Sequence, residues 1–281
     1  MLRWRVGNVT ITRVVDETDT KIGALVLPMA TPEAVAGIPW LRPHYLGEAG
    51  ELVLSIHSLV VESPGRRILV DTCLGNGKER AIRAWSLRSG PFLADLAASG
   101  SPRESIDTVL CTHMHVDHVG WNTMREGDRF VPTFPNARYL FSRIEWEHWK
   151  DEPETIGPVI TDSVRPILDA GLADLVETDH RVSDEISLEP TPGHTPGHVS
   201  VRIRSAGEEA AITGDMIHHP CQIARPDWSS AADTDPDRSR VTRRAFLEGC
   251  ADRPVLVIGT HFAAPTAGRI VRDGDAYRLA Q

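Results

Sequence analysis

The amino-acid sequence predicts an α/β protein built from two mixed β-sheets flanked by helices. Three observations support this fold class. Short runs rich in apolar and β-branched residues recur along the 281 residues, and such runs are typical of strands. The runs come partly in succession and partly with helix-like stretches between them, as expected for mixed sheets covered by helices. The composition, 41% hydrophobic and 25% charged, is that of an ordinary globular protein.

The elements follow in order along the chain. Apolar and β-branched runs predict strands at residues 9–15, 52–61, 66–72, 106–112, 136–142, 172–177, 185–189, 198–204, 209–213 and 254–259. Helices are expected at residues 91–99, 144–150, 155–170, with an interruption at Pro166, and 237–250. Residues 268–279 hold an Asp273-Gly274 turn between two short strands, which predicts a terminal hairpin.

Residues 22–47 differ in composition from the strands on either side. The segment is apolar, but prolines interrupt it at positions 28, 32, 39 and 43, so it fits neither a regular strand nor a long helix. We expect a single domain over residues 1–281, with this segment as an excursion that packs on the body. There it would act as a lid over a site or as a contact in a homodimer.

Charge and cysteine content limit the partners and the compartment. Thirty Lys and Arg against 39 Asp and Glu give a net charge of −9, which argues against a nucleic-acid partner because phosphate binding needs a basic face. The apolar runs are too short to span a membrane, and the first ten residues lack the apolar core of a secretory signal. We therefore expect a cytoplasmic protein with no membrane partner, whose cysteines are reduced and mostly buried: Cys73, Cys111, Cys221 and Cys250.

The most informative motif directly follows the strand predicted at residues 106–112. It reads H-x-H-x-D-H and consists of His113, His115, Asp117 and His118. A loop at the end of a strand can turn several side chains toward one point, and imidazole together with carboxylate suits divalent ions such as zinc. One short segment therefore supplies four candidate metal ligands.

Three more candidate ligands follow strands or lie in a glycine-containing loop. They are His194 in TPGHTPGH, Asp215 in AAITGD and His261 in VLVIGTH. The complete set is five histidines and two aspartates, enough for two metal ions that share one carboxylate. We expect two divalent ions, with zinc preferred and manganese, iron or cobalt also suited to these donors. Gly214 and Gly259 would let the backbone come close to the metals.

This ordered set of motifs resembles the metallo-β-lactamase fold superfamily of binuclear metallohydrolases, from about residue 52 to residue 270. The resemblance implies a four-layer αβ/βα sandwich with the metals at one edge. It implies one metal held by His113, His115 and His194. The other metal would be held by Asp117, His118 and His261, and Asp215 would bridge the two.

Two further residues, Asp71 and His198, each have two interpretations. Asp71, in LVDT, matches an acidic position that supports the metal site in the family, or else it is a strand-end cap. His198, the second histidine of TPGHTPGH, competes with His194 for the ligand role. Because the family's ligand is the first of these histidines, we expect His198 to be a packed histidine.

The predicted chemistry is hydrolysis. Two divalent ions about 3.5–4 Å apart lower the pKa of a bridging water toward neutrality, and the bridging hydroxide attacks a lactone, an ester or a phosphotriester. No G-x-S-x-G serine motif competes with this mechanism. The sequence thus predicts a metallo-hydrolase of the lactonase, esterase or phosphotriesterase type. A glyoxalase II-like thioester hydrolase and a non-catalytic metal-binding interaction protein stay as alternatives.

Within the superfamily, the chain is most similar to the methyl-parathion-hydrolase-like and acyl-homoserine-lactonase-like group. The similarity rests on DHVGWNT (117–123), GDMIHHPCQ (214–222) and the excursion at 22–47. It implies a small-molecule substrate with an apolar acyl or aryl part, which the tryptophans at 40, 85, 121 and 228 would contact. The expected catalytic residues are Asp117, also a ligand, and His218, which would donate to the substrate oxygen. His219 is the alternative to His218.

Overall fold

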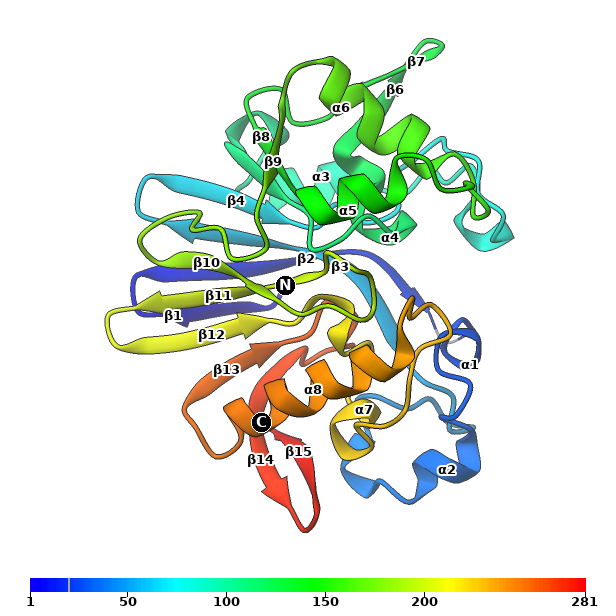
Figure 1. Cartoon of the computed structure of the whole chain (residues 1–281), viewed down its shortest axis with the longest axis vertical. Coiled ribbons are helices and arrows are strands. Elements are labelled where there is room, and N and C mark those ends of the chain that lie inside the picture. Colours follow the sequence, from blue (N-terminus) through cyan, green and yellow to red (C-terminus); the bar gives the residue numbers. More distant parts are fainter. Residues whose placement is uncertain (20) are drawn as a thin grey trace. The chain divides into compact units, whose positions relative to one another are not determined.

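The computed structural model describes residues 1–19 and 21–281, and the chain divides into two units (Figure 1). Unit 1 consists mainly of Arg3–Asp16 and Ile56–Thr178, and unit 2 of Glu17–Ser55 and Asp179–Gln281. Each unit carries a mixed sheet flanked by helices. The predicted α/β class with two mixed sheets is confirmed.

The sheet of unit 1, over the described residues, has seven strands in the order β1-β2-β3-β4-β5-β8-β9. The strands are β1 (Arg3–Val6), β2 (Val9–Asp19), β3 (Leu54–Ser63), β4 (Arg66–Val70), β5 (Thr108–Leu110), β8 (Arg138–Ser142) and β9 (Ala173–Val176). The last four pair in parallel. Parallel strands are covered on both faces, which explains why apolar runs, and not alternation, mark them in the sequence.

Helices and a small hairpin complete unit 1. The helical elements are η2 (Arg83–Trp85), α3 (Phe92–Ala98), η3 (Arg103–Ser105), α4 (Val116–Val119), η4 (Gly120–Asn122), α5 (Arg143–Trp149), the π-helical turn η5 (Ile160–Val164) and α6 (Arg165–Asp169). Strands β6 (Thr123–Glu126) and β7 (Arg129–Pro132) form the hairpin. Helix α5 packs on β8 and β9, and the Ser142 side chain caps its first turn by accepting the Glu145 N–H.

Unit 2 is built on a second sheet, whose described strands run in the order β10-β11-β12-β13-β14-β15. Their bounds are β10 (Ile186–Pro190), β11 (Val199–Ser205), β12 (Glu208–Ile212), β13 (Val255–Ile258), β14 (Ala267–Asp273) and β15 (Ala276–Ala280). Helices η6 (Gly214–Met216), α7 (Cys221–Ala224) and α8 (Pro236–Cys250) belong to this unit. Pro236 begins α8 and the Asp235 carboxylate accepts the Arg238 N–H, so the sequence itself specifies where α8 starts.

The 22–47 segment is part of the apolar core of unit 2. It holds three short helices, α1 (Gly23–Val26), α2 (Pro32–Ala36) and η1 (Pro39–Leu41), which confirms that neither a strand nor a long helix forms there. Its apolar side chains pack with those of α7, α8 and the sheet, and the buried ones include Leu27, Val35, Ile38 and Leu41. Pro32 and Pro39 lie in the first turns of α2 and η1, where the missing N–H costs no hydrogen bond, so each begins a new short helix.

The sequence-based list of elements differs from the structure in several places, and it lacked the short helices α4 and α7. It missed β1, β6 and β7, because four residues are too few to show a period-2 pattern. It began the helix at 155–170 too early, since helical structure starts at Ile160. The interruption expected at Pro166 is the change from η5 to α6, because Pro166 lies in the first turn of α6, where its missing N–H costs no hydrogen bond.

A buried charge cluster anchors the irregular segment after β4 to the π-helical turn η5. The Asp162 carboxylate accepts two hydrogen bonds from Arg80, at 2.6 and 2.9 Å, and lies 3.4 Å from Lys78 Nζ. Lys78 also donates to the Thr123 and Ser163 hydroxyls, both at 2.7 Å. Burial lowers the pKa of Lys78 to about 7, an effect that Asp162 opposes. One carboxylate therefore compensates two buried cations.

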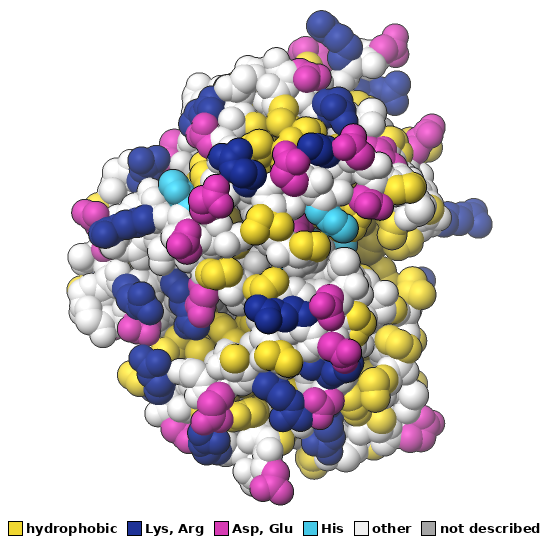
Figure 2. Space-filling view, in the orientation of Figure 1, with side chains coloured by type: hydrophobic (Ala, Val, Ile, Leu, Met, Phe, Trp, Pro, Cys, Tyr) yellow, Lys and Arg dark blue, Asp and Glu magenta, His cyan; other side chains and the backbone are white. Residues whose placement is uncertain are grey.

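Replacing Asp162 by Asn should strongly destabilise the protein, because Lys78 and Arg80 would lose their shared anion. Breaking a buried ion pair typically costs about 3–5 kcal/mol, and urea unfolding would measure the loss. A matched control is Asp174→Asn, since Asp174 pairs with Arg138 at the surface with 43% of its side chain exposed. Side chains of both charges are interspersed over the face in Figure 2, and exposed ion pairs contribute less than about 1 kcal/mol. Equal losses in both variants would contradict this account.

Within unit 2, the neutral form of His219 ties the 22–47 segment to the first residue of α7. Its Nε2–H donates to the Tyr45 carbonyl at 2.8 Å, and its Nδ1 accepts the Cys221 N–H at 3.1 Å. Protonation would place a second proton against that N–H. Burial of the ring lowers the pKa of His219 from 6.5 to about 4.

The His219 environment predicts a pH dependence of stability. Between pH 6.5 and 4 the unfolded chain binds a proton at His219 that the folded chain does not, so its contribution is complete above pH 6.5 and is lost as the pH falls toward 4. His219→Gln keeps a donor and an acceptor but does not titrate. Urea titrations at several pH values should show that the free energy of unfolding of His219→Gln falls less steeply than that of the wild type as the pH is lowered from 6.5 to 4. The difference in slope should be up to about 1.4 kcal/mol per pH unit. His44→Gln, at an exposed histidine of the same segment, should match the wild type, and a wild-type slope in His219→Gln would refute the assignment.

Candidate metal centre

The H-x-H-x-D-H motif lies in unit 1 where parallel strands β4 and β5 end side by side. Val70 pairs with Leu110, so Asp71 and the residues after Leu110 emerge at the same edge. Asp71 has a φ of 57°, a backbone conformation that few non-glycine residues adopt. Its carboxylate accepts the Thr112 N–H at 2.7 Å and the His118 Nδ1–H at 2.9 Å. Asp71 is therefore the residue that orients His118.

The four motif residues of unit 1 are close to one another. His113 and His115 have ring centroids 4.6 Å apart, and those of His113 and His118 are 4.1 Å apart. Asp117 Oδ1 lies 3.8 Å from His118 Nε2. Gly120 ends the motif by close backbone contact, because a Cβ there would lie 2.0 Å from the Leu74 carbonyl. The structure thus brings together the four donors predicted from this segment.

The three remaining predicted ligands meet in unit 2. Parallel strands β12 and β13 pair Ile212 with Ile258, so Asp215 and His261, each three residues further on, emerge beside each other. His261 Nε2 lies 3.1 Å from Asp215 Oδ1, and His194 Nε2 lies 3.5 Å from Asp215 Oδ2. All three side chains are buried. Two imidazoles therefore face one carboxylate.

His198 is a packed histidine, as expected, but it has a defined task. Its Nε2 accepts the Asp215 N–H at 2.8 Å, and its Nδ1 lies 2.8 Å from the Thr191 hydroxyl. Gly214 makes room for this ring, because its φ is 56° and a Cβ there would lie 2.4 Å from His198 Nε2. Gly259 accommodates the Phe262 ring in the same way. The structure thus gives each glycine a task in packing, and the prediction that both let the backbone come close to the metals stays a prediction.

The donor imidazoles have the hydrogen-bonding pattern that metal binding requires. Nδ1 of His118, His194 and His261 donates to the Asp71 carboxylate, the Asp233 carboxylate and the Ser55 carbonyl, respectively, at 2.9, 2.9 and 3.1 Å. A neutral imidazole whose Nδ1 carries the proton presents a lone pair at Nε2. In unit 2 these Nε2 atoms face the Asp215 carboxylate, an arrangement of acceptors that a bound cation would stabilise. The residues present fit divalent metal ions.

His218 lies beside the same carboxylate and His219 does not. His218 Nε2 is 3.3 Å from Asp215 Oδ2, and its ring is stacked on that of His261 at 6.0 Å. Among the residues that the structure describes, its buried Nδ1 has no hydrogen-bond partner. His219, by contrast, uses both nitrogens to hold Tyr45 and Cys221. Of the two histidines, His218 is therefore the one whose ring lies beside Asp215.

Several residues that organise the donors were not found from the sequence. Asp233 is one of several aspartates in a polar loop, and Ser55 acts through its carbonyl, so neither carries a recognisable signal. Glu145, buried on α5, accepts the Met114 N–H at 3.2 Å and the Trp149 Nε1–H at 2.8 Å. It thereby holds the backbone between His113 and His115. Of the predicted substrate-contacting tryptophans, Trp121 is buried and stacked on Phe92, which indicates packing.

The cysteines do not offer an alternative nucleophile. All four are free and buried, as predicted. Burial raises the pKa of each thiol, and most strongly for Cys73 and Cys111. Thiols of this kind stay protonated and unreactive near neutral pH.

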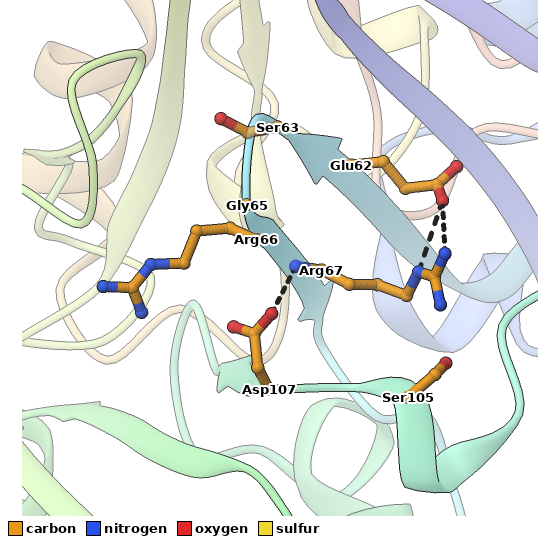
Figure 3. A pocket seen from close by; sticks show the side chains of 7 residues that line it. All are labelled: Glu62, Ser63, Gly65, Arg66, Arg67, Ser105 and Asp107. Carbon is orange, nitrogen blue, oxygen red and sulfur yellow. Dashed lines mark hydrogen bonds and ion pairs between the residues drawn. The ribbon is translucent and has the colours of Figure 1, made fainter.

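A pocket of about 310 Å³ lies away from these donors, at the β3–β4 turn of unit 1 (Figure 3). Its charged walls are largely compensated, since Arg67 pairs with Glu62 at 2.9 Å and donates its N–H to the Asp107 carboxylate. It contains none of the predicted donors.

The described helices are all too short or too polar to cross a membrane.

The chain is similar in sequence to a known protein family and to several individual proteins. The model of the metallo-beta-lactamase superfamily matches residues 52–261. An uncharacterised protein of Mycobacterium tuberculosis is 30% identical over 173 residues, which cover 57% of this chain and 70% of that protein. An N-acyl homoserine lactonase of a Bacillus species is 27% identical over 172 residues, covering 56% of this chain and 61% of the lactonase.

Solved structures show the same fold. AidC, a dizinc quorum-quenching lactonase solved with a product bound, superposes with a TM-score of 0.82 at 21% sequence identity, covering 99% of this chain and 95% of its own. These findings confirm the resemblance to the lactonase-like group and the predicted fold of two mixed sheets flanked by helices. The chain belongs to the metallo-β-lactamase superfamily.

Proposed function

We propose that the protein is a metallo-hydrolase that binds two divalent ions, with zinc preferred. One set of donors is His113, His115, His194 and Asp215, and the other is Asp117, His118 and His261, with Asp215 shared between the ions. The observation that carries the proposal is the convergence of imidazole Nε2 atoms on the buried Asp215 carboxylate, with their Nδ1 atoms already hydrogen-bonded. The Bacillus lactonase and AidC support hydrolysis as the reaction class.

The metal ions, Asp117 and His218 would have different roles in the reaction. When bound, two such ions supply Lewis acidity and lower the pKa of a water molecule toward neutrality. Asp117 is proposed both to bind metal and to act in catalysis, since its side chain lies at the start of α4 and is partly exposed. His218 would donate a hydrogen bond to the substrate oxygen or a proton to the leaving group. The Gln222 side-chain oxygen accepts the His218 backbone N–H at 2.7 Å, which holds the backbone that carries the imidazole.

The proposed substrate is a small molecule with an apolar acyl or aryl part. Lactones are the first candidates, because the N-acyl homoserine lactonase and AidC are named for that reaction. Aryl esters and phosphotriesters present a similar electrophile to the same donors. The lid or homodimer role of the 22–47 segment within one 1–281 domain stays a prediction. Leu25 and Met29, which are 63% and 53% exposed, are the side chains through which it would act.

Metal analysis tests the ligand assignment. Elemental analysis of zinc-reconstituted protein should give two ions per chain. Asp215→Ala should weaken binding of both ions, because it removes the shared carboxylate, whereas His113→Ala should mainly empty one position. The control His44→Ala changes an exposed histidine and should keep both ions. A wild-type protein that retains one ion at most would refute the binuclear proposal.

A hydrolysis panel tests the reaction and the role of His218 together. Metal-replete protein should hydrolyse lactones, aryl esters or phosphotriesters faster than a thioester, and a preference for the thioester would favour the glyoxalase II-like alternative. Metal binding without turnover on any substrate would favour a non-catalytic interaction protein. His218→Ala should keep both ions and lose turnover by about a hundredfold. The loss should be smaller for substrates with good leaving groups, and wild-type turnover on poor leaving groups would exclude His218.

A further inference from the structure

A buried arginine lies behind the donor side chains of unit 2. Arg243, on α8, has no exposed side-chain surface. Its Nε–H donates to the Met216 carbonyl at 2.8 Å, and Nη1 donates to the carbonyls of Pro226 and Trp228 at 2.7 and 3.1 Å. Nη2 donates to the Ser239 hydroxyl at 3.0 Å. One guanidinium thus binds three carbonyls and a hydroxyl that belong to four residues.

Three connections lead from Arg243 toward residues of the proposed metal centre. Met216 directly follows Asp215. Arg243 Nη2 lies 3.9 Å from Asp233 Oδ2, and Asp233 Oδ1 accepts the His194 Nδ1–H at 2.9 Å. The third connection is through the Trp228 carbonyl, which also accepts a hydrogen bond from Gln222 Nε2 at 2.8 Å. Gln222 in turn accepts the backbone N–H of His218.

We propose that Arg243 is a positioning residue for the metal centre, acting on Asp215 through the Met216 carbonyl and on His194 through Asp233. The inference rests on the metal-binding function proposed above. Arg243 contacts neither the proposed ions nor a substrate. Its effect is to fix the direction of the His194 imidazole and the turn that carries Asp215.

The chemistry of the site favours this role over plain packing. A buried charge is costly, and apolar side chains of similar size fill a core at least as well. A guanidinium offers five donors in a planar fork, so it can satisfy acceptors in several directions at once, whereas a lysine ammonium cannot reach all of them. Asp233 supplies the opposite charge, and its second oxygen also accepts the Ser230 N–H at 2.9 Å. The network is therefore satisfied on both sides, as a rigid support requires.

The test compares Arg243→Lys with Arg244→Lys in the full-length protein. Arg244 is the next residue of α8 and pairs with Asp227 at the surface, so it controls for loss of a guanidinium on the same helix. The zinc dissociation constant, measured by competition with a chromophoric chelator, should be about 10–100-fold larger for Arg243→Lys than for the wild type. It should be unchanged for Arg244→Lys. In metal-free protein, imidazole ¹⁵N shifts should show that His194 loses its Nδ1–H form in Arg243→Lys.

The outcomes separate the hypotheses. Wild-type zinc affinity and wild-type His194 shifts in Arg243→Lys, with only a lower unfolding temperature, would make Arg243 a packing residue and overturn the inference. If Arg243→Lys does not fold, Asp233→Asn carries the test, and wild-type zinc affinity in that variant would overturn the inference as well. If both fold, Arg243→Lys should weaken zinc binding less in the Asp233→Asn background than alone, and full additivity would exclude action through Asp233. A wild-type protein that binds no zinc would instead refute the proposed function.

Discussion

The hydrogen bond from an imidazole Nδ1 to an oxygen of a distant segment is the interaction on which the candidate centre depends. It recurs at His118, His194 and His261, whose acceptors lie 47, 39 and 206 residues away in the sequence. A buried imidazole must satisfy its N–H inside the protein, so each of these bonds fixes both a tautomer and a loop. The segments after β5, β10 and β13, which carry these three histidines, are irregular in shape but are held in place by these hydrogen bonds.

Buried charges provide a second layer of constraint in each unit. Asp162 in unit 1 binds Arg80 and Lys78, and Arg243 in unit 2 binds three carbonyls near Asp233. Such groups add little net stability compared with apolar packing, because desolvation offsets most of the attraction. What they contribute is a single arrangement of otherwise irregular backbone. In unit 2 that backbone carries Asp215 and His218, so the same physics that holds the loop also defines the proposed chemistry.

Much of the fold and of the site was predictable because the relevant signals are local. Apolar runs at 66–72, 209–213 and 254–259 mark buried parallel strands, and polar residues directly after them mark the sheet edge where ligands gather. The spacing of Asp215 and His261 from their strands is equal, and parallel pairing of β12 with β13 places them side by side. Short strands such as β1 and β6, and the start of the π-helical turn η5, were missed, since four or five residues carry no readable period.

The sequence by itself determined which residues are the candidate donors, because H-x-H-x-D-H, TPGH, GD and GTH combine side chains suited to metal binding with strand ends. Only the tertiary structure decided which partner orients each donor. Asp233 was indistinguishable from the aspartates around it, and Ser55 acts through a backbone carbonyl that every residue possesses. The choice of His218 over His219 was likewise tertiary. Adjacent histidines have the same chemistry, so the sequence does not distinguish them. In the structure, His219 is engaged by the Tyr45 carbonyl and the Cys221 N–H, whereas His218 lies beside Asp215.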